Sequence, residues 1–362
     1  MGIKNRFKTV LGLSVNKEQM SSNRQRHEVL MLNIDSSTLA SMHRPAFTWI
    51  LQHTDCKICT TSGILKNAFW MDLVDENFVI FTGLEWDIPI EMIKVQMDAL
   101  NEIKPFLSRI IYIMTPDEDH ATVLQNAGYN AFVCNKNCWI DENIFKPIKN
   151  EKLYDAILNA IPAPFKRHYL ANMVNNIALL SRLPWTNFDC EPILSELNWV
   201  YRNESRLLPE DVAMTINKAH VGLCLSEIEG ACFSSTEYLS CGIPVVSTHC
   251  SGGREFWYNE FNSVVCEPNA DSVAEAVCFL KNNPRDPERI RHECVEIIRM
   301  QRRNFVDIVN SICNSRNIQF NCQEFLNKHF ANRFLFQNQN SSLEEIRSKV
   351  KMGIEKAKTY VR

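Results

Sequence analysis

The sequence has little glycine. Only 11 of its 362 residues are glycine, against roughly 7% in average proteins. Five of them fall within one stretch of the chain: Gly222, Gly230, Gly242, Gly252 and Gly253. Glycine serves where the backbone needs a positive φ or where a ligand approaches the main chain closely. The functional site is therefore expected within residues 219–255.

Other absences exclude whole classes of protein. The 39 Lys+Arg and 42 Asp+Glu give a net charge of −3, so no excess positive charge points to nucleic acid as a partner. No apolar run approaches the ~18–20 residues of a membrane-spanning helix, and the N-terminal apolar stretch is too short for a secretory signal. The 14 cysteines show no regular spacing, which suits a reducing compartment. We expect a cytoplasmic protein.

The length and the apolar pattern predict two α/β domains. Chains of this size usually form two globular domains, and 45% apolar content excludes disorder. Short apolar runs alternate with helical stretches on both sides of a charged linker at 145–152, which indicates βαβ units and parallel sheets. Expected strands are 28–34, 77–83, 109–114, 220–226, 243–248 and 262–267; expected helices are 90–107, about 167–181, 209–219, 232–241 and 271–282.

The two ends of the chain are basic. Residues 1–27 would allow a short amphipathic helix on an anionic membrane surface, or form a loosely packed terminus. Near the other end, Ser341 and Glu344 form a capping box before an amphipathic helix. We expect that helix to dock onto the protein's own domains, with peripheral membrane contact as the alternative.

The stretch 217–257 carries the chemistry. Residues 226–231 follow the carboxyl end of an expected strand and lead into a helix N-terminus, where free N–H groups suit a diphosphate. Glu229 and Glu237, eight residues apart, would share one face of a continuous helix. Two carboxylates so placed can accept hydrogen bonds from the vicinal hydroxyls of a sugar or ribose.

The residues of this stretch resemble a known family. E-G-A-C-F-S-S-T-E, then Y-L-S-C-G-I-P-V-V-S-T and S-G-G-R-E, is similar to the nucleotide-binding signature of group 1 (family 4) glycosyltransferases. The resemblance is close over about 153–282, including PFKRHYLA at 164–171, and looser back to 138. It implies the GT-B architecture, two Rossmann-like domains facing across a cleft. The expected parts are a basic segment 1–27, a reduced acceptor domain 28–150, a donor domain 151–315, and helices 316–362 crossing back to the acceptor domain.

The resemblance also implies roles for individual residues. Glu229 would contact the donor sugar, and Glu237 would hold the ribose hydroxyls. Lys166, with Arg167, would stabilise the diphosphate as it leaves. The remaining donor-binding positions are Ser226, Gly230, Ala231, Cys232 and Gly253. The family needs no metal or cofactor, so none is expected.

The implied function is that of a retaining glycosyltransferase. It would move a sugar from a nucleoside diphosphate donor, UDP- or GDP-sugar, to a glycan, polysaccharide or glycolipid. Two departures from the family pattern keep an alternative open. Ile161 stands where the family usually has Arg, and the N-terminal half lacks a glycine pair. The alternative is a degenerate member that binds a sugar nucleotide or glycan without turnover.

Several isolated residues allow a functional and a structural interpretation. His120 could approach the acceptor or serve only at a helix start, and His168 could act on the substrates or be structural. Cys56 and Cys59 have the spacing of half a zinc site, with Cys134 and Cys138 as a conceivable other half. That spacing is poor for a zinc ribbon. We interpret the cysteines of the C-terminal half as small buried hydrophobic residues.

Overall fold

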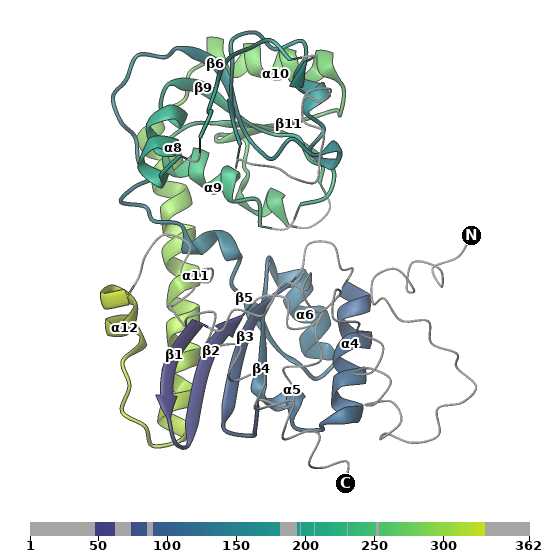
Figure 1. Cartoon of the computed structure of the whole chain (residues 1–362), viewed down its shortest axis with the longest axis vertical. Coiled ribbons are helices and arrows are strands. Elements are labelled where there is room, and N and C mark those ends of the chain that lie inside the picture. Colours follow the sequence, from purple (N-terminus) through teal and green to yellow (C-terminus); the bar gives the residue numbers. More distant parts are fainter. Residues whose placement is uncertain are drawn as a thin grey trace, which may run out of the picture.

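The computed structural model describes residues 48–61, 74–84, 90–181, 194–195, 197–205, 207–229, 231–250 and 253–329. The chain forms two α/β halves, one above the other in Figure 1, and the long helix α11 (Pro287–Ser315) runs alongside both. The predicted α/β class with two largely parallel sheets is confirmed. The expected strand 28–34, the basic segment 1–27 and the capping box at Ser341 lie outside the described residues.

The N-terminal sheet follows the chain order β1-β2-β3-β4-β5. β1 is antiparallel to β2, and the other pairs are parallel. The strands expected at 77–83 and 109–114 are present as β3 and β4, whereas the β1–β2 hairpin was not predicted. The elements are β1 (Thr48–His53), β2 (Cys56–Thr61), β3 (Phe78–Gly83), α4 (Ile90–Ile103), α5 (Leu107–Ile110), β4 (Ile111–Thr115), α6 (Glu118–Asn126), β5 (Asn130–Val133) and the 3-10 turn η3 (Lys136–Trp139).

Both faces of this sheet are covered. Side chains alternate along a strand, so neighbouring residues face opposite sides. Ile80 packs in one cluster with Met97 of α4. Its neighbour Phe81 packs on the other face against Phe305 of α11, with ring centroids 4.8 Å apart. The N-terminal sheet therefore completes its core with a helix supplied by the C-terminal part of the chain.

The C-terminal sheet has the order β11-β10-β9-β6-β7-β8, with every pair parallel. Counted from β6, this is the doubly wound order 3-2-1-4-5-6, which reverses between β6 and β9. The elements are β6 (Tyr154–Asn159), β7 (Ile177–Leu180), β8 (Trp199–Arg202), α8 (Pro209–Ile216), β9 (Ala219–Cys224), α9 (Phe233–Ser240), β10 (Val245–Thr248), η6 (Arg254–Trp257), β11 (Ser263–Cys266) and α10 (Ala270–Asn282).

The helix expected at 167–181 was wrong. The chain forms the short 3-10 turns η4 (Pro164–Lys166) and η5 (His168–Ala171) and then the buried strand β7. Arg167 and Asn176 have positive φ values of 50° and 47°, and a left-handed residue interrupts a right-handed helix. The strand β8 was not among the expected elements. The other expected elements of this half are present within a few residues of their predicted bounds.

The crossover between the halves takes place within α11. Phe305 in its second half contacts Trp139 of the N-terminal half, with ring centroids 5.0 Å apart. Arg316, at its C-terminal end, donates to the backbone oxygens of Asp55 and Asn77. Helix α12 (Cys322–His329) follows, and its Cys322 N–H donates to Asn310 of α11. No helix among the described residues has the length and apolar character needed to cross a bilayer.

Glycine is required at two places beside the expected site. A Cβ on Gly222 of β9 would come within 2.1 Å of the Tyr238 ring on α9, so glycine lets this helix lie close to the sheet. Gly253 has a φ of 92°, and a Cβ there would lie 2.5 Å from Pro116 Cβ in the N-terminal half. At these two positions the glycines serve contacts inside the protein.

Candidate functional site

The site lies at the reversal of strand order in the C-terminal sheet. Ligands of open parallel sheets bind beyond the carboxyl ends of strands at such a point. Here the ends of β6 and β9 enclose a small cavity of about 20 Å³, which is room for about one water molecule. It is lined by Leu158, Asn159, Ala160, Lys166, Leu223, Cys224, Leu225, Ser226, Glu229, Cys232 and Ser234.

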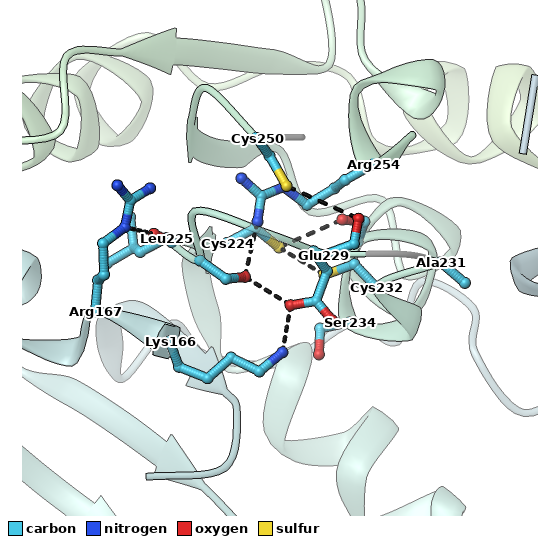
Figure 2. Close-up of polar contacts among 12 residues, drawn as sticks. Lys166, Arg167, Cys224, Leu225, Glu229, Ala231, Cys232, Ser234, Cys250 and Arg254 are labelled. Atoms are coloured by element: carbon cyan, nitrogen blue, oxygen red, sulfur yellow. Dashed lines mark hydrogen bonds and ion pairs between the residues drawn. The ribbon is translucent and has the colours of Figure 1, made fainter. Parts of the chain in front are cut away.

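Glu229 is the centre of a polar chain at this cavity. Its Oε2 forms an ion pair with Lys166 Nζ and accepts a hydrogen bond from Ser226 Oγ at 2.6 Å. Both charged side chains are only 15% exposed. Arg254 extends the chain, because its Nη1 donates to Ser226 Oγ at 2.9 Å. Figure 2 shows Lys166, Glu229 and Arg254 converging. The structure thus brings together three of the predicted residues, Lys166, Ser226 and Glu229.

Arg254 was missed by the sequence analysis. Its side chain is fully buried, and its Nη2 donates to the backbone oxygen of Thr248 at 2.7 Å. Because arginine stays protonated in proteins, it places a permanent charge beneath the cavity. Burial alone would raise the pKa of the adjacent Cys224 thiol, but hydrogen bonding from Cys232 and the Arg254 charge lower it to about 7. The sequence shows this arginine directly after the glycine pair in S-G-G-R-E. No sequence pattern, however, indicates that its side chain is buried.

Arg167 brings a third cation to the same sheet edge. Its left-handed backbone turns the side chain toward the strand ends. There Nε donates to the Leu225 oxygen at 2.7 Å and Nη2 to Thr248 Oγ1 at 2.8 Å. Lys166, Arg167 and Arg254 thus meet beyond β6, β9 and β10, with Glu229 as the carboxylate in contact with the group. The electrostatic field at this edge favours an anion.

The start of α9 borders the same cavity. Cys232, immediately before the helix, has φ 46° and ψ 73°, and Ser234 Oγ donates to the Asn159 backbone oxygen at 2.6 Å. The free N–H groups and the positive dipole end of a helix start attract phosphate. Ala231 and Cys232 lie where the sequence placed them, whereas Gly230 lies outside the described residues.

Glu237 does not share a helix face with Glu229. The expectation of one continuous helix was wrong, because α9 begins only at Phe233, after the left-handed Cys232. Glu237 is fully buried in the helix, and its Oε2 accepts a hydrogen bond from Asn159 Nδ2 at 2.8 Å. Asn159 lines the cavity and Glu237 does not. The asparagine therefore stands between the two carboxylates.

The loop that carries Gly253 reaches the other half of the molecule. The positive φ of Gly253 begins the turn η6, and its Cα packs against Pro116, which follows β4. Gly253 therefore lies between the two halves, and its part in donor binding stays a prediction.

The two histidines have structural surroundings. His168 is buried and hydrogen-bonds the backbone of Ala160. Burial lowers its pKa to about 4, so it is neutral at physiological pH. His120 sits in the first turn of α6, where its N–H and Nδ1 both lie within hydrogen-bond distance of Asp117 Oδ1, at 2.9 and 2.7 Å. This geometry favours the helix-start role for His120.

The cysteines do not form the zinc site considered from sequence. Cys56 and Cys59 belong to core clusters on opposite faces of the N-terminal sheet, so their thiols cannot share an ion. Cys134 and Cys138 lie together, with sulfurs 3.7 Å apart, and are fully buried. Within the described part of the chain, no three His, Cys, Asp or Glu side chains are grouped to hold a metal ion.

Residues 205–296 match the family described as glycosyl transferases group 1. The matched span runs from the residues before α8 into α11 and includes Ser226, Glu229, Glu237 and Arg254. It leaves Lys166 and Arg167 outside. The match over residues 205–296 agrees with the resemblance seen in the sequence.

Solved structures of similar shape are remote in sequence. HepE from Anabaena, in complex with UDP, is 11% identical over 64% of this chain and 72% of its own, with a TM-score of 0.49. Sucrose-phosphate synthase from Thermosynechococcus elongatus is 14% identical over 66% and 69%, with a TM-score of 0.49. A glycosyltransferase from Rickettsia africae is 13% identical over 64% and 70%, with a TM-score of 0.47. Comparison with curated proteins gave no match.

Proposed function

We propose that this protein transfers a sugar from a nucleoside diphosphate donor to an acceptor hydroxyl, with retention of configuration and without a metal. The observation that carries the proposal is the Lys166–Glu229 ion pair at the strand reversal, with Arg167 and Arg254 bonded to neighbouring groups at the same sheet edge. In this proposal residues 151–315 bind the donor and residues 28–150 face the acceptor, which is a glycan, polysaccharide or glycolipid.

The Lys166–Glu229 ion pair suggests how the donor enters. A diphosphate competes for the ammonium group of Lys166, because it carries more negative charge than one carboxylate. Glu229, still held by Ser226, then has an oxygen free to accept hydrogen bonds from the sugar hydroxyls. The ion pair thus balances the charges of Lys166 and Glu229 until a donor binds.

The chemical step needs charge stabilisation rather than a covalent nucleophile. As the glycosidic bond to the diphosphate breaks, negative charge grows on the leaving oxygen. We expect Lys166, Arg167 and the N–H groups at the start of α9, which lie at this edge of the sheet, to stabilise this charge. Fixed donors at such a place lower the barrier because they need no reorganisation during the step. The acceptor hydroxyl attacks from the side on which the leaving group departs.

The ribose site is proposed beside Asn159. Glu237 is assigned to the ribose hydroxyls, and its Oε2 is now bonded to Asn159 Nδ2. Donor binding would exchange this hydrogen bond for one from the ribose, at little net cost. The nucleoside is therefore expected beyond the carboxyl end of β6.

Thermal unfolding with UDP, GDP, ADP and CMP tests the donor site. A nucleotide at a hundred times its dissociation constant adds about 2.7 kcal/mol to the free energy of unfolding. We expect one nucleotide to raise the midpoint of the wild type. Glu237→Gln should remove this rise, whereas Asp155→Asn, a carboxylate elsewhere on β6 that pairs with Lys281, should keep it. No rise with any nucleotide would contradict the proposal.

A binding protein without turnover is the second candidate. One observation favours it: Ile161 stands at the position of the family's usual Arg. Release of the nucleotide from its sugar donor separates the two candidates. Turnover that disappears in Glu229→Gln supports the transferase, and nucleotide binding without turnover supports the binding protein.

A further inference from the structure

Buried amide side chains join the N-terminal half to the start of α9. Asn135 and Asn137 follow β5, and Gln301 lies in α11. Asn137 and Gln301 are fully buried and Asn135 is 1% exposed. Burying an amide costs free energy unless it is hydrogen-bonded, so the bonds that these side chains make have to explain their position.

The bonds form a continuous path between the halves. Gln301 Oε1 accepts from the Asn135 N–H at 2.7 Å, and Asn135 Oδ1 accepts from the Asn137 N–H at 3.0 Å. Asn137 Nδ2 then donates to the backbone oxygens of Ala231 and Cys232. The path therefore begins in the crossover helix and ends at the residues that border the proposed diphosphate site.

The bond to Ala231 fixes the direction of one peptide group. The C=O and N–H of a trans peptide point in opposite directions. When the Ala231 oxygen faces Asn137, the Cys232 N–H therefore faces away from it. The Cys232 oxygen also accepts from the Ser235 N–H at 3.0 Å inside α9, so the helix itself directs the Phe233 N–H. Asn137 thus decides which way the Cys232 N–H, immediately before α9, is directed.

A purely structural role explains this arrangement poorly. Asn137 Oδ1 and Gln301 Nε2 are buried without a hydrogen-bond partner among the described residues, and such groups carry a desolvation penalty. Apolar residues of similar size would avoid that penalty at a domain interface. What they could not supply is an N–H donor for the Ala231 carbonyl.

We propose that Asn137 is a positioning residue for the donor: from the N-terminal half it holds the peptide between Ala231 and Cys232 in the orientation that binds the diphosphate. This inference rests on the proposed function. It makes donor affinity depend on the docking of the two halves, although the phosphate-binding groups all belong to the C-terminal half.

Asn203 provides a matched control. It is also buried, and its Nδ2 also donates to two backbone oxygens, those of Ser181 and Ser205, each at 2.8 Å. It lies directly after the edge strand β8. Asn203 Oδ1 also accepts from the Ser181 N–H at 2.8 Å, whereas Asn137 Oδ1 has no partner among the described residues. Asn203→Ala therefore removes two donor bonds, as Asn137→Ala does, and one further bond, and it should lower the unfolding midpoint at least as much. Asn137→Ser, which keeps one donor, serves if the alanine variant fails to fold, and should retain part of the affinity.

Two measurements then distinguish a role of Asn137 in positioning the donor site from a role in stability alone. Titration with UDP should show a dissociation constant raised about tenfold in Asn137→Ala and changed by less than about twofold in Asn203→Ala. The donor KM should follow the dissociation constant, with a smaller change in kcat. Without any ligand, amide hydrogen exchange over residues 231–236 should be faster in Asn137→Ala than in Asn203→Ala.

The outcomes are distinguishable. If the wild type binds UDP and both alanine variants lose affinity equally, the positioning role is overturned and the proposed function stands. If the wild type binds none of the four nucleotides, the proposed function fails and with it the link to the donor. Equal exchange at residues 231–236 in the two variants would show that Asn137 does not hold this peptide, whatever the protein binds.

Discussion

The two sheets use their carboxyl edges differently. In the C-terminal sheet the strand order reverses between β6 and β9, and the edge at this reversal carries Lys166, Arg167, Glu229 and Arg254. Among the described strands of the N-terminal sheet the order follows the chain, so these strands form no crevice of this kind. The proposed donor site therefore uses a feature that only one of the two described sheets has.

The polar residues of the N-terminal edge are used for docking. Asp117 caps α6, Pro116 packs against Gly253, and Asn137 donates to the residues before α9. Arg302 of α11 adds bonds to the Cys138 oxygen and to the carboxylate of Glu142. The C-terminal edge is thus equipped to bind an anion. The N-terminal edge makes contacts that hold the two halves together.

The largest effect on turnover is expected from a substitution that removes a cation from the C-terminal edge. Lys166→Met should lower turnover about a hundredfold or more, because one fixed donor to developing charge is worth that much. Lys281→Met is the matched control. It breaks an ion pair with Asp155 that is well separated along β6 from the cavity and partly exposed, at 38% and 20%. This control should cost at most about 1 kcal/mol of stability and leave turnover unchanged.

Steady-state assay of donor consumption decides the matter. Equal loss in the two lysine variants would mean that charge anywhere on this sheet matters. Wild-type turnover in Lys166→Met would remove Lys166 from the chemistry and leave Arg167 as the cation to test next.

The contact between the two edges gives the next largest effect. Gly253 and Gly128 have similar φ values, 92° and 86°, but an added Cβ meets Pro116 at 2.5 Å in the first case and nothing within 4 Å in the second. Each alanine variant bears about 1–2 kcal/mol of backbone strain. Gly253→Ala alone must also separate the halves, at about 1–3 kcal/mol for overpacking.

Urea unfolding of both variants measures the difference. Gly253→Ala should be the less stable of the two, and it should also weaken nucleotide binding, because the loop borders the site. If the two variants lose the same stability, the halves are not pressed together at this point, and the docking role of the N-terminal edge has to be reconsidered.

The position of the site followed from local sequence, whereas its geometry did not. The clustered glycines and the strand–loop–helix pattern led to the edge where Glu229, Ser226 and Lys166 meet. The relation between Glu229 and Glu237 was wrong because a single left-handed residue, Cys232, moves the helix start past Glu229. Hydrophobic periodicity does not indicate which residue adopts a left-handed backbone. Glycine would have suggested it, but cysteine does not.

The contacts between segments far apart in the sequence could not be predicted from local patterns either. Asn137 and Ala231 are 94 residues apart, and neither residue type is unusual where it stands. The strand β7 was mistaken for helix because Ile177–Leu180 is a short apolar run, buried along its whole length, and such a run fits either element. The hairpin of β1 and β2 lies at a sheet edge, where local pattern is weakest.

The smallest expected effect concerns pH and distinguishes the two histidines. Burial lowers the pKa of His168 to about 4, from about 6.5 in an unfolded chain. Between these values the unfolded chain binds a proton that the folded one does not, so stability falls as the pH falls from 6.5 to 4. From pH 7 to 5.5 the free energy of unfolding falls by about 1 kcal/mol for this reason.

Chemical denaturation across this range should show a shallower pH dependence for His168→Gln than for His120→Gln, which changes the half-buried histidine at the N-terminal edge. Equal slopes would mean that His168 takes up its proton in the folded protein, and that the C-terminal edge is more open to water than the cavity beside β6 implies.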